Sequence, residues 1–263
     1  ISTDGKTIVS GGEDGTVRMW NREGGQIGQP FQGHQGDVTS VAISTDGQTI
    51  VSGGHDGTVR MWNREGKSIG QLIESRQDAV MSVAISTDGQ TIVSGGFDGT
   101  VRIWNREGEP IGQPFKGHQD RVFSVAISTD SQIIVSGGFD GTVRIWNREG
   151  RQIGQPFKGH QGMVSSVAIS TDGQTIVSGG DDRTVRMWNR EGKSIGQPFK
   201  GHQYQVMSVV ISTDGQTIVS GGADGTVRMW NREGGLISQP FKGHQGLVVS
   251  VVISTDGQTI VSG

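Results

Sequence analysis

The sequence predicts an all-β protein built from one repeated unit of four antiparallel strands. Tryptophan recurs at intervals of 42 residues, at positions 20, 62, 104, 146, 188 and 230. The phrase ISTDG or ISTDS occurs seven times, and 45 of the 263 residues are glycine. A fixed period of this length is typical of repeat architectures, and frequent glycine disfavours helices. Because the period covers the whole chain, we predict a single domain over residues 1–263.

The first two strands of a unit are visible in residues 39–54. Residues 39–44, TSVAIS, alternate in polarity and are rich in β-branched side chains, which favours a strand. Asp46-Gly47 then predicts a two-residue hairpin turn, because both residues can adopt positive φ. Residues 48–54, QTIVSGG, are expected to form the second strand.

The third and fourth strands follow a second Asp-Gly pair at residues 56–57. Residues 58–63, TVRMWN, form the third strand, with successive side chains on opposite faces. Residues 64–66 then turn the chain into a short outer strand around residues 69–73. Four short antiparallel strands in about 42 residues are one blade of a β-propeller. We therefore predict a single β-propeller of four-stranded antiparallel blades.

The number of blades follows from counting strands. Six copies of the first, third and fourth strands and seven of the second give 25 strands, one more than six blades need. We predict that residues 248–254 supply the inner strand of a blade whose outer strands come from the N-terminus. Six blades would then close the ring and leave no exposed sheet edge. Seven blades are the alternative, in a longer parent or by completion between chains, and near-identical repeats make self-association by strand swapping possible.

The order Gly-His, STDG and then IVSGGxDGTVRMWN resembles the WD40 repeat, in its near-identical bacterial form. All six copies end in Trp-Asn where the family usually has Trp-Asp, at a position that the family tolerates. The resemblance implies a non-enzymatic scaffold that is a C-terminal sensing or assembly module of a larger bacterial signalling protein. It also implies a ring that usually has seven blades.

The resemblance further implies a buried hydrogen-bonded tetrad in each blade: the His of Gly-His, a Ser of the second strand, the turn Asp and the Trp. Each of these groups would be costly to bury alone, and each can satisfy another. The predicted structural tetrads are His34, Ser52, Asp56 and Trp62; His118, Ser136, Asp140 and Trp146; His160, Ser178, Asp182 and Trp188; and His202, Ser220, Asp224 and Trp230.

One short stretch imitates a hydrolytic triad, because Ser52, His55 and Asp56 lie within five positions. The serine and the aspartate recur in blade after blade, whereas a catalytic site is needed once, and His55 has no histidine counterpart in other repeats. We therefore predict no enzymatic activity and no catalytic residue. The chain has no cysteine and no metal-binding motif, so we predict neither a metal nor a cofactor.

Residues 71–77, QLIESRQ, depart from the QPFKGHQ of other repeats. Arg76 stands in the histidine column and Ser75 in the preceding glycine column. We expect this blade to lack one tetrad bond, so that Arg76→His would stabilise the protein by about 1 kcal/mol. Either drift that the other blades tolerate, or an altered loop that contacts a partner, accounts for the departure.

Three repeat columns differ most between blades, and a fourth differs moderately. They are the residue before the turn aspartate, the residues on either side of the first-strand valine, and the column that contains Tyr204. Both connections lie at the same end of a blade, so these residues are expected to surround one mouth of the central channel. Aromatic and methionine side chains there are typical of an interface. The predicted partner-binding residues of this mouth are Glu13, His55, Phe97, Phe139, Asp181, Ala223, Asp37, Arg121, Met163, Gln205, Leu247, Met81, Phe123 and Tyr204.

The charge and the amino-acid composition of the chain limit the classes of partner that we expect. A net charge of -3 gives no reason to expect nucleic acid or an anionic membrane, and no apolar run approaches the ~18 residues of a membrane span. The absence of cysteine suits the reducing cytoplasm, where we place the chain. We predict a protein or peptide partner. The alternatives are a glycan-binding lectin, which should repeat one site in every blade, and an engineered or fragment array without a selected ligand.

Overall fold

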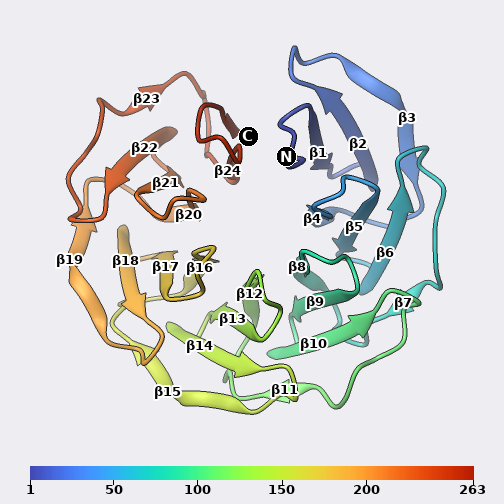
Figure 1. Ribbon diagram of the computed structural model, residues 1–263, viewed down its shortest axis with the longest axis horizontal. Helices are drawn as coiled ribbons and strands as arrows, with labels where there is room; N and C mark the ends of the chain where they lie inside the picture. Colours follow the sequence, from blue (N-terminus) through green and yellow to red (C-terminus); the bar gives the residue numbers. More distant parts are fainter.

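The computed structural model of the chain describes residues 1–263 as 25 strands joined by turns. The strands form seven antiparallel sheets around a central axis: five of four strands, one of three and one of two (Figure 1). The predicted all-β propeller is confirmed. The chain contains no helix long and apolar enough to cross a membrane.

Each strand takes one of four positions between the centre of the ring and its outer wall (Figure 1). The innermost strands are β4 (Val38–Ile43), β8 (Val80–Ile85), β12 (Val122–Ile127), β16 (Val164–Ile169), β20 (Val206–Ile211) and β24 (Val251–Ile253). The second strands are β1 (Thr7–Gly11), β5 (Thr49–Gly54), β9 (Thr91–Gly96), β13 (Ile133–Gly138), β17 (Thr175–Gly180), β21 (Thr217–Gly222) and β25 (Ile260–Ser262). The third strands are β2 (Thr16–Asn21), β6 (Thr58–Asn63), β10 (Thr100–Asn105), β14 (Thr142–Asn147), β18 (Thr184–Asn189) and β22 (Thr226–Asn231). The outermost strands are β3 (Gln26–Gln32), β7 (Ile73–Glu74), β11 (Phe115–Lys116), β15 (Gln152–Lys158), β19 (Ser194–Lys200) and β23 (Phe241–Lys242).

The two ends of the chain do not share a blade, contrary to the prediction. β1 pairs with β2, and β24 pairs with β25 rather than with any N-terminal strand. The reason lies in the spare second strand. β1 and β25 are copies of the same strand, and each pairs with the neighbour to which a short turn already joins it. The N-terminal sheet therefore lacks an innermost strand, and the C-terminal sheet lacks the third and outermost strands.

Side-chain contacts nevertheless join these two sheets, which lie next to each other in the ring (Figure 1). Arg22 donates a hydrogen bond to the hydroxyl of Thr259 at 2.9 Å. Arg64 makes the equivalent contact with Thr7 in the preceding sheet at 3.2 Å. The C-terminal sheet is thus placed beside the N-terminal sheet as one blade is placed beside the next, and the ring has seven positions rather than six.

The hydrophobic core lies between neighbouring blades. In one cluster, Ile133, Val143 and Phe157 of one blade pack with Val164 and Trp188 of the next. The ring centres of Phe157 and Trp188 are 5.7 Å apart, and such aromatic pairs add to the stabilisation from burial. The same pairing occurs in Phe31–Trp62, Phe115–Trp146 and Phe199–Trp230. Because each blade is held by its neighbours, the strand ends at both rims keep fixed positions.

Candidate functional site

A β-bulge near the start of the innermost strand shapes one end of every complete blade. In β12, Val122 pairs with Gly138 and Ser124 pairs with Gly137, which leaves Phe123 as the extra residue. The same shift of register occurs in β4, β8, β16 and β20. A bulge redirects side chains at a strand end. The bulged position is one of the three most variable columns, so the side chains of that column project from a backbone irregularity common to all five complete blades.

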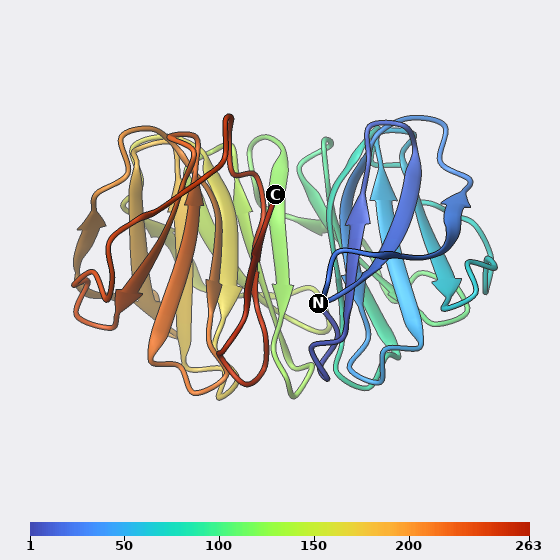
Figure 2. The same cartoon turned by 90° about the horizontal axis from the view of Figure 1, so that it is seen from above.

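A backbone hydrogen bond brings the other two columns together. The amide of Phe139 donates to the carbonyl of Arg121 at 2.9 Å. The equivalent bonds run from His55 to Asp37, from Phe97 to Ala79, from Asp181 to Met163 and from Ala223 to Gln205. All three columns therefore meet at one end of each complete blade, the end opposite the STDG turns. Figure 2 shows the ring from the side, with the N-terminal ISTDG turn at the lower edge.

All fourteen predicted mouth residues are at least partly exposed. The exposed ones are Glu13, His55, Phe97, Phe139, Asp181, Tyr204 and Leu247. The half-buried ones are Asp37, Met81, Arg121, Phe123, Met163, Gln205 and Ala223. Two of the fourteen, Glu13 and Leu247, belong to the incomplete sheets and lack a partner from the neighbouring column.

Two neighbouring blades bring an aromatic cluster together around one arginine. Cζ of Arg121 lies 3.8 Å from the centre of the Phe97 ring and 5.7 Å from that of Phe139. The ring centres of Phe123 and Phe139 are 6.1 Å apart. A guanidinium within about 6 Å of an aromatic face is attracted by it. The sequence predicted each of these residues as a separate variable position of the repeat. The structure shows that they contact one another across two blades.

Inside the blades, four histidines make the contacts that the family resemblance implies. Nε2 of His34 lies 2.7 Å from Oγ of Ser52, and Nε1 of Trp62 donates to the same oxygen at 2.8 Å. Nδ1 of His34 lies 3.1 Å from the carboxylate of Asp56. The contacts are repeated around His118, His160 and His202. The histidine and serine of each set are buried, which suits a framework role.

The protonation of this network also suits a framework. Burial alone would raise the pKa of Asp56, but hydrogen bonds from the Gln35 amide, the Thr58 hydroxyl and His34 outweigh it and hold the pKa at about 2. Burial lowers the pKa of His34 and of His202, in spite of the neighbouring carboxylates. At neutral pH, His34 and His202 are therefore neutral imidazoles, closed off from solvent and paired with the carboxylates of Asp56 and Asp224.

The blade β8–β11 keeps the bond to its serine through a different residue, but Asp98 accepts hydrogen bonds only from Thr100 and Arg102. The expected loss of a tetrad bond is therefore confirmed for the aspartate and wrong for the serine. Gln77 is fully buried, and its Oε1 accepts a hydrogen bond from Ser94 Oγ at 2.7 Å. Trp104 donates to the same hydroxyl at 3.0 Å, and Gln77 Nε2 donates to the carbonyl of Thr100 at 2.9 Å. Arg76 is exposed, with a left-handed φ of 54°. The chain shifts by one residue here, and an amide takes the place of the imidazole.

The incomplete sheets each hold part of the same network. Trp20 donates to Ser10 at 2.8 Å in the N-terminal sheet, without a histidine. His244 lies 2.8 Å from Ser262 in the C-terminal sheet, without a tryptophan. His244 was not among the predicted tetrad residues, and it is exposed because no third strand covers it.

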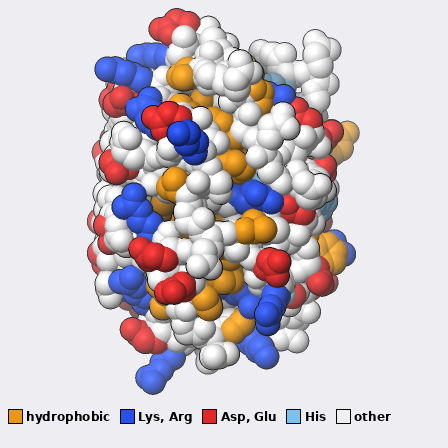
Figure 3. All heavy atoms as spheres, turned by 90° about the vertical axis from the view of Figure 1, so that its right-hand side faces the viewer, with side chains coloured by type: hydrophobic (Ala, Val, Ile, Leu, Met, Phe, Trp, Pro, Cys, Tyr) orange, Lys and Arg blue, Asp and Glu red, His pale blue; other side chains and the backbone are white.

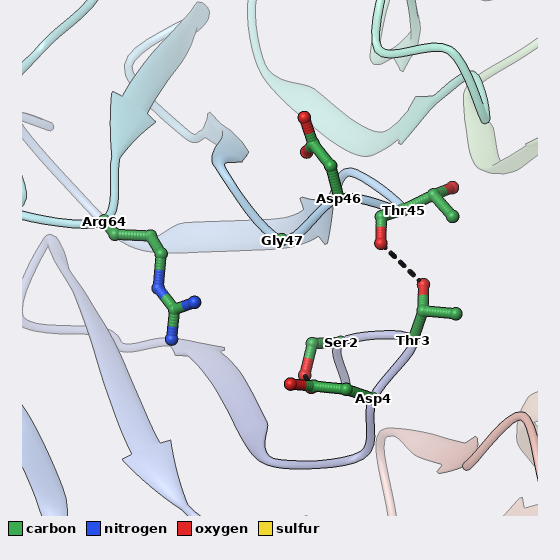
Figure 4. A pocket seen from close by; sticks show the side chains of 7 residues that line it. All are labelled: Ser2, Thr3, Asp4, Thr45, Asp46, Gly47 and Arg64. Carbon is green, nitrogen blue, oxygen red and sulfur yellow. Dashed lines mark hydrogen bonds between the residues drawn. The ribbon is translucent and has the colours of Figure 1, made fainter.

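The opposite end of the ring carries polar pockets that recur between blades. One, of about 290 Å³, is lined by Ser2, Thr3, Asp4, Thr45, Asp46, Gly47 and Arg64 (Figure 4). A second, of about 310 Å³, is lined by the equivalent residues around Arg232. Figure 4 shows the hydroxyl of Thr3 donating to the carbonyl of Thr45, at 2.8 Å. Neither pocket has an aromatic or other hydrophobic side chain.

The outer wall of the ring has a different character from the mouth. Over β3, β6 and β7 it presents basic and acidic side chains of both signs, interspersed among polar atoms and small hydrophobic areas (Figure 3). Mixed charges without one dominant sign are typical of a solvated surface. The aromatic cluster around Arg121 is therefore a more distinctive feature than the outer wall.

These features define a β-propeller repeat protein with a constant framework and a variable mouth. The chain belongs to the WD40 family: the sequence profile described as "WD domain, G-beta repeat" matches residues 1–21, 25–63, 66–105, 108–147, 150–189, 192–231 and 235–263. A stretch of 40 residues is 50% identical to the periodic tryptophan protein 2 homolog of Dictyostelium discoideum. That match covers 15% of this chain and 4% of the Dictyostelium protein.

Proposed function

We propose that this chain is a non-enzymatic scaffold that binds a protein or peptide at the mouth. WD40 propellers are generally scaffolds of this kind. The observation that carries the proposal is the exposure of Phe97 and Phe139, 39% and 48%, at equivalent positions of adjacent blades. Neither ring belongs to the buried clusters between blades, so the fold gives no reason for them. Exposed aromatic side chains close to an arginine are the composition of interface hot spots.

A paired comparison tests the scaffold proposal. Immobilised protein is exposed to cell extract, and the retained proteins are compared between the wild type and the Phe97→Ala, Phe139→Ala double variant. The matched control is Leu72→Ala with Leu236→Ala, because these leucines are similarly exposed but lie beside the outermost strands. We expect partners to be lost only from the mouth variant. Equal recovery of every partner by both variants would contradict the proposal.

A glycan-binding lectin is the second candidate, and the recurring polar pockets are the observation that favours it. A lectin that binds repeated sugars should carry the same site in several blades, and two equivalent pockets occur in this ring. Against it, the pockets contain no aromatic ring on which a sugar could stack. A glycan array decides between the two: binding that is weakened by Arg64→Ala and weakened further by adding Arg232→Ala would favour the lectin.

The wider setting of the scaffold is also part of the proposal. The near-identity of the repeats supports a module of a larger bacterial signalling or assembly protein, and the absence of cysteine suits the cytoplasm. Expression of the full natural chain with a fluorescent tag would test both its size and its compartment.

A further inference from the structure

The guanidinium of Arg121 is held in place but has no acceptor for its hydrogen bonds. Its face lies on the Phe97 ring, and Phe139 is also within cation–π distance. Its Nε is buried without a hydrogen-bond partner. The nearest carboxylate, that of Asp120, is 3.8 Å from Nε and accepts instead from the backbone amide of Arg121, at 2.7 Å. Because Nε is enclosed, the donors that Arg121 offers to a ligand are its two Nη groups, which make no hydrogen bond within the protein.

The surroundings of these donors are apolar on two sides. Phe97 comes from the blade β8–β11, while Phe123 and Phe139 come from the blade β12–β15. No other blade offers this arrangement, because the positions equivalent to Arg121 are Asp37, Ala79, Met163, Gln205 and Leu247. One cation between two aromatic surfaces thus marks a single place on the ring, and a segment that crosses it meets apolar surface before and after the charge.

We propose that Arg121 binds the side-chain carboxylate of an aspartate or glutamate within an extended peptide, whose neighbouring apolar side chains pack on Phe97 and on Phe139. This inference rests on the proposed function and names the chemistry of its partner. A planar guanidinium edge matches a carboxylate through two parallel hydrogen bonds. One arginine with Asp120 beside it suits a singly charged carboxylate better than a phosphate group of charge about −2. Apolar surface on both sides favours an internal residue over a chain terminus.

A random peptide library displayed on phage provides the probe. Selection is carried out on the wild-type protein, and the enriched peptides are then measured in solution by calorimetry. We expect them to share an acidic residue with an aliphatic or aromatic residue on each side. Replacing that acid by its amide should weaken binding about tenfold or more, the scale of a charge-assisted hydrogen bond.

Protein variants assign the effect to Arg121. Arg121→Gln should weaken the acidic peptide about as much as the amide substitution does, and the two changes together should add little. Arg121→Lys keeps the charge but loses the planar edge, so it should fall between Arg121→Gln and the wild type. The control is Arg151→Gln, an exposed arginine in the turn between β14 and β15, at the opposite end of the blade. This control should bind like the wild type.

The outcomes separate this inference from the proposed function. Peptides that need Phe97 and Phe139 but carry no acidic residue would overturn the role of Arg121 and leave the scaffold proposal standing. Peptides that bind equally well to Arg121→Gln would do the same. If no enriched peptide depends on Phe97 and Phe139, both proposals fail.

Discussion

The amide oxygen of Gln77 lies 2.7 Å from the hydroxyl oxygen of Ser94, in the place that an imidazole takes in four other blades. The glutamine follows Arg76, and Arg76 is the residue that aligns with those histidines in sequence. A shift of one residue in the loop has therefore preserved a hydrogen bond while changing the chemical group that makes it.

Removing this glutamine side chain should be costly. Gln77→Ala would leave Ser94 and the carbonyl of Thr100 without their partner in a buried site, and we expect the free energy of unfolding to fall by about 1–3 kcal/mol. The matched control is Gln119→Ala, in the same repeat column but exposed, which should change it by less than about 0.5 kcal/mol. Urea denaturation followed by tryptophan fluorescence measures both. Equal effects would show that Gln77 contributes no buried bond.

Arg76→His should not stabilise the protein, contrary to what the sequence suggests. Its side chain is exposed, and the site into which a histidine would point is already filled by Gln77. We expect a change within about 0.5 kcal/mol in the same denaturation experiment. A gain of about 1 kcal/mol would mean that the imidazole displaces the glutamine.

Serines in equivalent positions should contribute different amounts to the stability of the fold. Ser52 is bonded to both His34 and Trp62, whereas Ser10 has only Trp20. Ser52→Ala leaves two groups without a partner, and we expect it to destabilise by about 2–4 kcal/mol. Ser10→Ala should cost about half as much, because one bond is lost instead of two. The melting temperatures of the two variants should fall in that order, and the reverse order would contradict a cooperative role for the histidine.

Acid should destabilise the fold in two stages. The pKa values of His34 and His202 are lowered by burial, so the unfolded chain binds these protons more tightly than the folded one. Stability is therefore full above the ordinary histidine pKa of about 6.5 and falls as the pH decreases below it. The second stage comes from Asp56 and Asp224, whose pKa values of about 2 make their stabilisation full above pH ~4 and lost as the pH approaches 2.

Melting curves between pH 8 and pH 2 measure both stages. Substituting His34→Gln and His202→Gln together should flatten the first decline. The second should become smaller without disappearing, because the two histidines are only one of several groups that lower the pKa of Asp56 and Asp224. An unchanged first decline would show that these histidines are not its origin.

Much of the fold could be predicted from the sequence, because turn residues mark the ends of the strands and the repeats are nearly identical. The same near-identity made it impossible to predict from the sequence how the first and last strands pair where the ring closes. β1 and β25 have the same sequence pattern, so nothing in the residues themselves decides which of them pairs with which neighbour. The choice depends on chain connectivity and on the room around the ring.

The candidate site could be predicted only in part from the sequence, for a different reason. Variable columns identified Phe97, Arg121 and Phe139, but a column comparison treats each blade separately. The stacking of Arg121 on Phe97 crosses from one blade to the next, and a bulge that sequence spacing does not reveal sets the position of the neighbouring Phe123. The role of Gln77 could not be predicted, because aligning the repeats by position does not reveal a shift of one residue within a loop.

The junction between the first and last sheets has a consequence for motion. Arg22 and Thr259 join these sheets through a polar contact, whereas buried aromatic pairs hold most other blades together. Phe241, the last phenylalanine of that series, has no tryptophan to cover and is 49% exposed. We expect amide exchange to be fastest in β24, β25 and β1. The blades β8–β11 and β12–β15, which form the aromatic cluster around Arg121, lie across the ring from this junction (Figure 1). Local opening of the junction would therefore leave the geometry of the cluster undisturbed.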